Sequence, residues 1–174
     1  LECTLPHKNP DNRGMRRYFS FASSPKENEI LIAMKFSEKS STFKNALQEL
    51  EPGDELSLNL IGGDFVLPKD TEKPLIFIAG GIGITPFRSM IQNIIDTKTQ
   101  RPITLFYANR TEEDIAWREF FEGTEWGLKF ISVITERDGH ITADMIQREA
   151  PNYKESTFYL SGPMPMVKSF EKLL

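Results

Sequence analysis

Cysteine and histidine are nearly absent from this sequence, and their scarcity excludes several kinds of site. Cys3 is the only cysteine among 174 residues, so the chain has no internal disulfide and no iron–sulfur cluster held by its own thiolates. The 2 histidines, His7 and His140, are too few and too far apart in sequence to suggest a metal centre. We therefore expect this chain to bind no metal.

Long apolar runs and an excess of positive charge are also lacking. No apolar stretch approaches the roughly 20 residues of a membrane-spanning helix, and no signal peptide is visible. The formal net charge of −4 and the isoelectric point near 5.3 argue against a nucleic-acid-binding protein. With 39% hydrophobic and 26% charged residues, the composition is that of a globular protein. We expect a cytoplasmic location, with any membrane tether outside this chain.

The most informative stretch that is present covers residues 75–86 and reads LIFIAGGIGITP. Its first five residues form an unbroken apolar run, which suits a strand buried on both faces of a parallel sheet. Gly80, Gly81 and Gly83 then permit a sharp turn and let a ligand lie against bare backbone. The stretch predicts a strand followed by a ligand-binding turn.

The residues after these glycines predict a helix. Thr85 is expected to cap it and Pro86 to occupy its first turn. A helix N-terminus presents free N–H groups and a partial positive charge, so it favours a phosphate. A tight turn without a ligand is the alternative, because a glycine-rich turn alone is a weak indication.

The two halves of the sequence differ in pattern, which predicts two domains. Up to residue 70 the candidate strands alternate apolar and polar residues, as in an antiparallel sheet with one helix. From residue 71 strands and helices alternate, which implies right-handed crossovers and a parallel sheet. The expected strands are 1–5, 29–36, 56–60 (half buried), 75–79, 103–108, 128–134 and 157–161. The expected helices are a short one capped by Ser40 or Ser41, then 86–96, 112–121, 143–149 and 165–174.

A second informative stretch, residues 17–25, combines arginine, aromatic and hydroxyl side chains. The fork of Arg17 can hold a phosphate through two hydrogen bonds. Phe19, two positions on in a strand, points the same way and can lie on a flat ring, and Ser20 can hydrogen-bond a ring nitrogen. Taken alone, the stretch is better explained as a strand with a surface arginine. Its pairing with the glycine turn favours a cofactor site.

In order and content, these segments resemble the ferredoxin–NADP⁺ reductase family of flavoenzymes. The family's barrel motif, R-x-[YF]-[ST], is matched by Arg17, Phe19 and Ser20. Its nucleotide motif, G-G-x-G-x-[TS]-P, is matched at every position of 80–86, and its final motif, C-G-P-x-x-M, corresponds to SGPMPM at 161–166.

The resemblance implies the fold and the extent of each domain. Residues 1–70 are expected to form an incomplete antiparallel β-barrel that binds FAD, with its N-terminal strands missing. Residues 71–174 are expected to form an α/β, Rossmann-like domain whose parallel sheet binds NAD(P). The chain is expected to be truncated at both ends, because it also lacks the C-terminal aromatic residue that covers the flavin ring in this family.

The resemblance further implies roles for single residues on the flavin side. Arg17 is expected to bind the flavin pyrophosphate, Phe19 to pack on the flavin, and Ser20 to hydrogen-bond near flavin N5. Ser41 and Thr42, at a helix start, match the family's second pyrophosphate contact.

On the nucleotide side, the resemblance implies a second set of contacts. The residues expected to contact the dinucleotide are Gly80, Gly81, Gly83, Thr85, Pro86, Gly162, Pro163 and Met164. Ser161 stands where the family usually has a cysteine beside the reacting nicotinamide, and its hydroxyl can fill that space and donate a hydrogen bond. Ser20 and Ser161 are therefore the expected catalytic residues.

The choice of nucleotide depends on the residue after the second strand of the parallel sheet. NAD-selective sites often place an acid there to hold the ribose hydroxyl, and NADP sites place an arginine. Here Arg110 follows the strand, so we expect a preference for NADPH with Arg110 on the 2′-phosphate. The alternative is a solvated Arg110 that pairs with Glu113 or Asp114.

Together, the resemblance implies an FAD-containing NAD(P)H oxidoreductase. Its cofactors would be FAD and NADP(H) or NAD(H), and its electrons would pass to a redox partner. That partner would be an iron–sulfur protein or domain, a haem or membrane domain, or an oxygenase component. The alternative is a catalytically weak, nucleotide-binding or regulatory subunit of the same fold.

Overall fold

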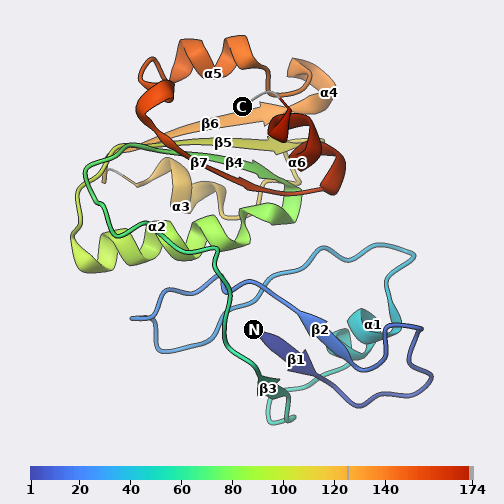
Figure 1. Cartoon of the computed structure of the whole chain (residues 1–174). Coiled ribbons are helices and arrows are strands. Elements are labelled where there is room, and N and C mark those ends of the chain that lie inside the picture. The colour runs from blue at the N-terminus through green and yellow to red at the C-terminus, as the bar shows by residue number, and fades with distance from the viewer. Residues whose placement is uncertain (125, 173–174) are drawn as a thin grey trace.

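The computed structural model describes residues 1–124 and 126–172 and contains two sheets of different kinds (Figure 1). A three-stranded antiparallel sheet, in the order β2-β1-β3, forms in the N-terminal part, which we define as residues 1–70. A four-stranded parallel sheet, in the order β6-β5-β4-β7, forms in the C-terminal part, residues 71–174. The expected fold class, an antiparallel β unit followed by a Rossmann-like α/β unit, is confirmed.

Seven strands and eight helices make up the described chain. The strands are β1 (Glu2–Thr4), β2 (Arg16–Tyr18), β3 (Ser57–Asn59), β4 (Leu75–Gly80), β5 (Ile103–Asn109), β6 (Leu128–Ile134) and β7 (Thr157–Ser161). The α-helices are α1 (Thr42–Gln48), α2 (Thr85–Thr97), α3 (Arg118–Glu122), α4 (Thr135–Asp138), α5 (Ala143–Glu149) and α6 (Met164–Glu171). The 3₁₀ helices are η1 (Gly81–Ile84) and η2 (Tyr153–Glu155). Every helix among the described residues of both parts is too short or too polar to cross a membrane.

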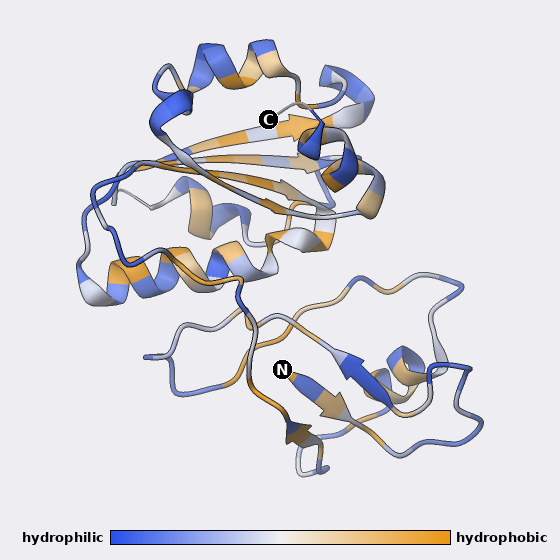
Figure 2. Ribbon diagram, in the orientation of Figure 1, coloured by the Kyte–Doolittle hydropathy of each residue, from blue (hydrophilic) through white to orange (hydrophobic). Residues whose placement is uncertain are grey.

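Strand β4 lies in the middle of the parallel sheet and is buried along its whole length. Leu75 and Phe77 face a core shared with α2 and α3, and Ile76 and Ile78 face a core shared with α5 and α6. Figure 2 shows this central apolar layer between more polar helices. The continuous apolar run predicted such burial because a central parallel strand is covered on both faces.

The antiparallel sheet is small and rests on helix α1. Its core consists of Leu1, Cys3, Leu5 and Phe43, and Phe43 comes from α1. Ser41 is the N-cap of this helix, and its hydroxyl accepts a hydrogen bond from the backbone N–H of Lys44. The predicted short helix and its serine cap are therefore confirmed.

Two strand predictions in the N-terminal part need correction. Residues 29–36 form no strand and make only an isolated bridge between Phe21 and Ile32, because their hydrogen bonds go to the loop at 22–23. The strand predicted at 56–60 forms as β3 but is not half buried. Leu58 and Leu60 are 39% and 69% exposed, since β3 is an edge strand that pairs with β1 alone.

Three helix predictions in the C-terminal part also need correction. The helix predicted over 112–121 covers only Arg118–Glu122, because Trp117 has a left-handed φ of 53° that interrupts the helical path. Thr85 does not cap α2, since its hydroxyl donates to the carbonyl oxygen of Ile82 at 2.7 Å and α2 continues directly from η1. Pro86 lies in the first turn as expected. The helix predicted over 165–174 ends at Glu171, and positions 173–174 lie outside the described residues.

A set of polar contacts, which we call the clamp, joins loop 22–27 of the N-terminal part to helix α2. Arg88 donates to the carbonyl oxygen of Ala22 at 3.0 Å and to the carboxylate of Glu27. Ser24 donates to the carboxylate of Asp96. The Arg88 guanidinium holds the pKa of Glu27 below its ordinary value, and the Ser24 hydroxyl does the same for Asp96. The clamp ties the N-terminal part to α2 at Arg88, near the start of the helix, and at Asp96, near its end.

Candidate functional site

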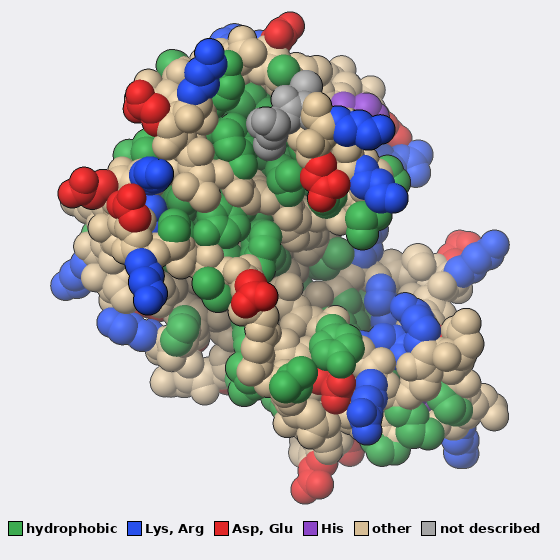
Figure 3. Space-filling model, viewed as in Figure 1, with side chains coloured by type: hydrophobic (Ala, Val, Ile, Leu, Met, Phe, Trp, Pro, Cys, Tyr) green, Lys and Arg blue, Asp and Glu red, His purple; other side chains and the backbone are tan. Residues whose placement is uncertain are grey.

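A cleft of about 1050 Å³ lies between the two parts, where the strands of the parallel sheet end. Figure 3 shows the molecule hollowed there, with Lys and Arg side chains gathered on the lower part beside the hollow. Parallel sheets commonly bind ligands outside the carboxyl ends of their strands. The cleft therefore has the position and size of a binding site for a large, flat cofactor.

The glycine turn forms one wall of this cleft, and glycine is required at its positions for different reasons. Gly81 has a φ of +51°, and a Cβ atom there would meet nothing within 4 Å, so bare backbone faces open space. A Cβ on Gly83 would lie 2.2 Å from the carbonyl oxygen of Ser161, and one on Gly162 would lie 3.0 Å from the nitrogen of Gly80. Gly81 is thus open to a ligand, whereas Gly83 and Gly162 allow two backbone segments to touch.

This close packing brings together the nucleotide motif at 80–86 and the final motif at 161–166. Strand β7 runs beside β4, and Ser161 stands opposite Ala79 in the register. The chain after Ser161 then crosses directly over the glycine turn. Residues separated by some 80 positions in sequence consequently share one wall of the cleft.

Most of the predicted site residues line the cleft, and four do not. Those that line it are Phe19, Ser20, Gly80, Gly81, Gly83, Thr85, Pro86, Arg110, Ser161, Gly162 and Pro163. Those outside its lining are Arg17, Ser41, Thr42 and Met164, whose side chain is 64% exposed. The nucleotide motif and the aromatic end of the barrel motif meet in one cleft, but the predicted phosphate contacts of the flavin do not take part.

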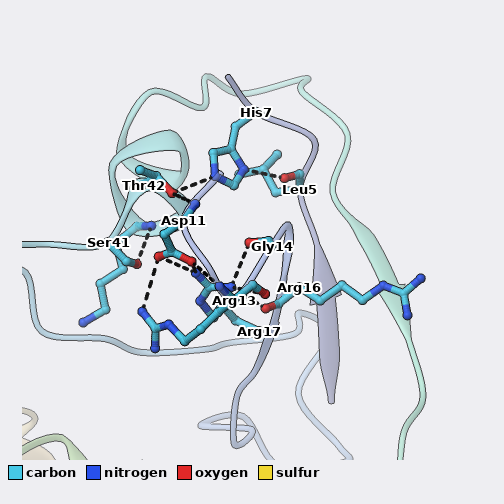
Figure 4. Close-up of polar contacts among 10 residues, drawn as sticks. Leu5, His7, Asp11, Arg13, Gly14, Arg16, Arg17, Ser41 and Thr42 are labelled. Atoms are coloured by element: carbon cyan, nitrogen blue, oxygen red, sulfur yellow. Dashed lines mark hydrogen bonds and ion pairs between the residues drawn. The ribbon is translucent and has the colours of Figure 1, made fainter. Parts of the chain in front are cut away.

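Arg17 is turned into the N-terminal part, where its two terminal nitrogens donate to groups of the same chain (Figure 4). Its buried Nε has no hydrogen-bond partner among the described residues. Its Nη2 donates to both carboxylate oxygens of Asp11, at 2.7 and 2.8 Å. Its Nη1 donates to the carbonyl oxygens of Arg13, Gly14 and Arg16, at 3.1, 2.9 and 2.6 Å. The guanidinium also lies over the ring of Phe43, 5.2 Å from its centroid.

The expected second phosphate contact is occupied as well. The hydroxyl of Thr42 accepts the backbone N–H of Asp11 at 3.1 Å and lies 3.1 Å from Nε2 of His7. Ser41 uses its hydroxyl to cap α1. Arg17, Ser41 and Thr42, which the resemblance assigned to the flavin pyrophosphate, therefore all make hydrogen bonds within the chain, and Nε of Arg17 alone is left without a partner.

Arg110 lies in the cleft wall at the carboxyl end of β5 and is 77% exposed. Its Nε donates to Glu136 at 2.6 Å, and this carboxylate raises the pKa of Arg110 above its ordinary value. The partner is thus neither Glu113 nor Asp114, the two acids named in the alternative. Asp114 instead pairs with Lys35 of the N-terminal part, which adds a second polar link across the cleft.

Several lining residues escaped the sequence analysis. Asn109 is 3% exposed, and its carboxamide has no hydrogen-bond partner in the described part of the chain. Its place at the carboxyl end of β5 is a signal that sequence reasoning could have used. Lys35 and Lys44 also line the cleft, from a loop and from α1. Nothing in their sequence surroundings marks them.

Comparisons with known proteins identify the family of the C-terminal part. Residues 77–172 match the family model described as an oxidoreductase NAD-binding domain. A flavohemoprotein of Candida albicans is 31% identical over 172 residues, which cover 91% of this chain and 43% of that protein. The reductase component of propane 2-monooxygenase from Rhodococcus jostii is 29% identical over 177 residues, covering 91% and 47%.

Solved structures show the same fold. The crystal structure of an Amycolatopsis cytochrome P450 reductase superimposes with a TM-score of 0.77 at 24% identity, covering 98% of this chain and 54% of that one. The chain spans about half the length of the curated relatives it matches, 46% and 47% for two of them.

Proposed function

Because the chain belongs to the oxidoreductase NAD-binding domain family, we propose that it is the reductase module of a flavoenzyme. The module takes hydride from NAD(P)H and passes electrons through FAD to a partner protein. The observation that carries this proposal is the single cleft that joins Gly81 and Ser161 of one part to Phe19 and Ser20 of the other. A hydride donor and acceptor must meet in such a shared space.

The nucleotide side of the cleft supports this proposal residue by residue. The bare backbone at Gly81 lets the dinucleotide approach closely, and Thr85, Pro86 and Gly80 shape the turn around it. Gly162 and Pro163 would border the nicotinamide, and Met164 lies outside the cleft lining. Ser161 would offer a hydroxyl to the reacting ring of the nucleotide, and Ser20 would offer one to the flavin.

The flavin side fits the cofactor only in part. Phe19 and Ser20 line the cleft, where they can contact the flavin ring. Arg17, Ser41 and Thr42, assigned to its pyrophosphate, are engaged within the chain. FAD, when bound, accepts a hydride and releases electrons one at a time. The residues of this chain therefore fit the ring of FAD better than they fit its pyrophosphate.

The expected preference for NADPH is part of the proposal. Arg110 is exposed in the cleft wall, and Nε is its only nitrogen with a partner among the described residues. Its terminal nitrogens can therefore receive the 2′-phosphate. We expect Arg110→Ala to lower kcat/KM for NADPH at least about 10-fold with little change for NADH.

The control for this experiment is Arg118→Ala. Arg118 is an arginine of the same part that pairs with Glu112 and Glu122 outside the cleft lining. Both nucleotides are assayed with ferricyanide as the electron acceptor. An equal loss with both nucleotides, or no loss with NADPH, would contradict the role of Arg110.

The partner and the domain limits complete the proposal. Relatives named as flavohemoproteins and as the reductase component of a monooxygenase support a haem domain or an oxygenase component as the acceptor, with an iron–sulfur protein as the third class. We assign residues 1–70 to FAD binding and 71–174 to NAD(P) binding. We also propose a cytoplasmic location, with any membrane tether outside this chain.

Colour tests the proposed function directly. We expect purified protein supplied with FAD to be yellow and to bleach when NADPH is added without air. A second candidate, a nucleotide-binding module without turnover, is favoured by the closed state of Arg17. Protein that binds NADP⁺ but cannot be reconstituted with FAD would establish this second candidate instead.

A further inference from the structure

One nitrogen of the Arg17 fork that the proposed flavin site needs, Nη2, is occupied by a side chain of the same protein. Asp11 accepts two hydrogen bonds from Nη2 at 2.7 and 2.8 Å, so the contact is bidentate on the carboxylate (Figure 4). We infer that Asp11 competes with the flavin phosphate for Arg17, so that FAD binds fully only after the loop 7–14 releases this arginine. The inference rests on the proposed function and explains why its phosphate site is closed.

The Asp11 carboxylate and the flavin phosphate compete for Arg17 because their chemistry is similar. Carboxylate and phosphate both present paired oxygens that match the planar fork of arginine. One fork holds one such partner at good geometry, and two anions beside the same cation repel each other. With Asp11 in place, its carboxylate offsets the charge of Arg17 and repels an approaching phosphate.

Asp11 contacts two of the residues that were predicted to bind the phosphate. Its carboxylate occupies Arg17, and its backbone N–H donates to the hydroxyl of Thr42 at 3.1 Å. Local bonds hold it there, since the backbone N–H of Arg13 donates to Oδ1 at 2.9 Å and that of Gly14 donates to the Asp11 carbonyl at 2.8 Å. A single turn of the chain therefore holds Asp11 against both Arg17 and Thr42.

The surroundings of Asp11 also allow its contact with Arg17 to break. The Asp11 side chain is 24% exposed, and the residues just before it, 8–10, are exposed. Arg13 stands 3.6 Å from Oδ2 of Asp11 with a side chain that is 62% exposed. When Arg17 turns to a phosphate, Asp11 keeps a cationic partner in Arg13, which lowers the cost of the exchange.

The test measures flavin binding by the full chain, from the quenching of flavin fluorescence. We expect Asp11→Ala to bind FAD about 10- to 100-fold more tightly than the unaltered protein, because one competing charge-assisted contact is removed. FMN should show a similar gain, whereas riboflavin should show none because it has no phosphate.

A matched control removes a comparable aspartate. Asp54 lies in an exposed turn of the same part, and its carboxylate accepts the backbone N–H of Glu51 at 2.8 Å. Asp54→Ala should leave FAD affinity unchanged. The double variant Asp11→Ala/Arg17→Ala should lose the gain, because the phosphate would then have no fork to enter.

Three results would overturn the inference. They are weaker FAD binding by a folded Asp11→Ala protein, an equal gain with riboflavin, and unchanged FAD affinity. If Asp11→Ala does not fold, Asp11→Asn removes the charge and keeps the backbone contacts, and the same outcomes apply to it.

NADP⁺ binding is titrated on the same proteins to separate this inference from the proposed function. A flavin-binding protein that does not respond to the change at Asp11 overturns the inference alone. If no variant binds FAD while all bind NADP⁺, both the inference and the flavin half of the proposed function fail.

Discussion

The two parts of the chain differ in how much core supports each half of the cleft. Among the described residues, the parallel sheet carries core clusters of 12 and 8 buried residues, and the antiparallel sheet carries one of 4. The glycine turn follows a fully buried strand, so packing enforces its shape. The Arg17 site lies on three-residue strands and a loop, where a side chain of the protein can take the place of a ligand. In this molecule the motif that keeps an open binding geometry is the one that a large core surrounds.

The largest expected effect tests the smaller core. Phe43 is fully buried in the 4-residue cluster and touches the rings of His7 and Phe19. Phe43→Ala should cost about 3–5 kcal/mol, which is most of what so small a core can supply. Unfolding in urea, followed by circular dichroism, should then show an early loss of the N-terminal part while NADP⁺ binding persists. A single cooperative transition that abolishes both would mean that the two parts depend on each other fully.

The next prediction tests the packed turn of the larger core. A Cβ on Gly83 would lie 2.2 Å from a backbone oxygen, which the flanking strand cannot move away. Gly83→Ala should therefore destabilise the protein by about 3 kcal/mol or more. Thermal unfolding measures this cost. A loss below about 1 kcal/mol would show that β7 shifts easily past the turn.

Gly81→Ala should separate binding from stability in the same turn. The φ of +51° makes alanine there cost about 1–2 kcal/mol, but no atom is struck. We expect the affinity of the protein for NADP⁺ to fall by more than the loss in folding stability would produce, since the added methyl group enters the cleft. Gly53→Ala is the control, because Gly53 also has a positive φ, +106°, and open space, and lies in a turn away from the cleft lining. Equal NADP⁺ affinity in both variants would remove Gly81 from the binding surface.

Sequence reasoning succeeded for the C-terminal part because periodicity and burial agree there. The strands at 128–134 and 157–161 and the helix at 143–149 form with the predicted bounds. A central strand covered on both faces and helices covered on one leave distinct apolar patterns. The junction of the motifs at 80–86 and 161–166 also followed, since both lie where parallel strands end.

The N-terminal part was harder to predict because its strands are short and its partners are few. Alternation at 29–36 signals a strand only if a second strand is available, and here the backbone bonds go to a loop. The motif at Arg17 identified a residue able to hold a phosphate but not the anion that it holds. Asp11 lies in a polar loop whose composition gave no sign of its partner, because that contact is set by how the loop folds back on α1.

The smallest expected effect concerns the clamp that joins the two parts. Arg88 holds the pKa of Glu27 below its ordinary value, so the pair stabilises the folded state above the unfolded pKa, near about 4.3. That contribution is lost as the pH falls through the lower, folded pKa. Glu27→Gln should cost about 1 kcal/mol at pH 7, and the difference from the unaltered protein should shrink when the pH is lowered below the folded pKa of Glu27, where its carboxyl becomes neutral. Urea unfolding of the two proteins at both pH values measures it. A cost that stays constant with pH would assign the role of Glu27 to packing and not to its charge, and the orientation of the two parts would then be independent of this ion pair.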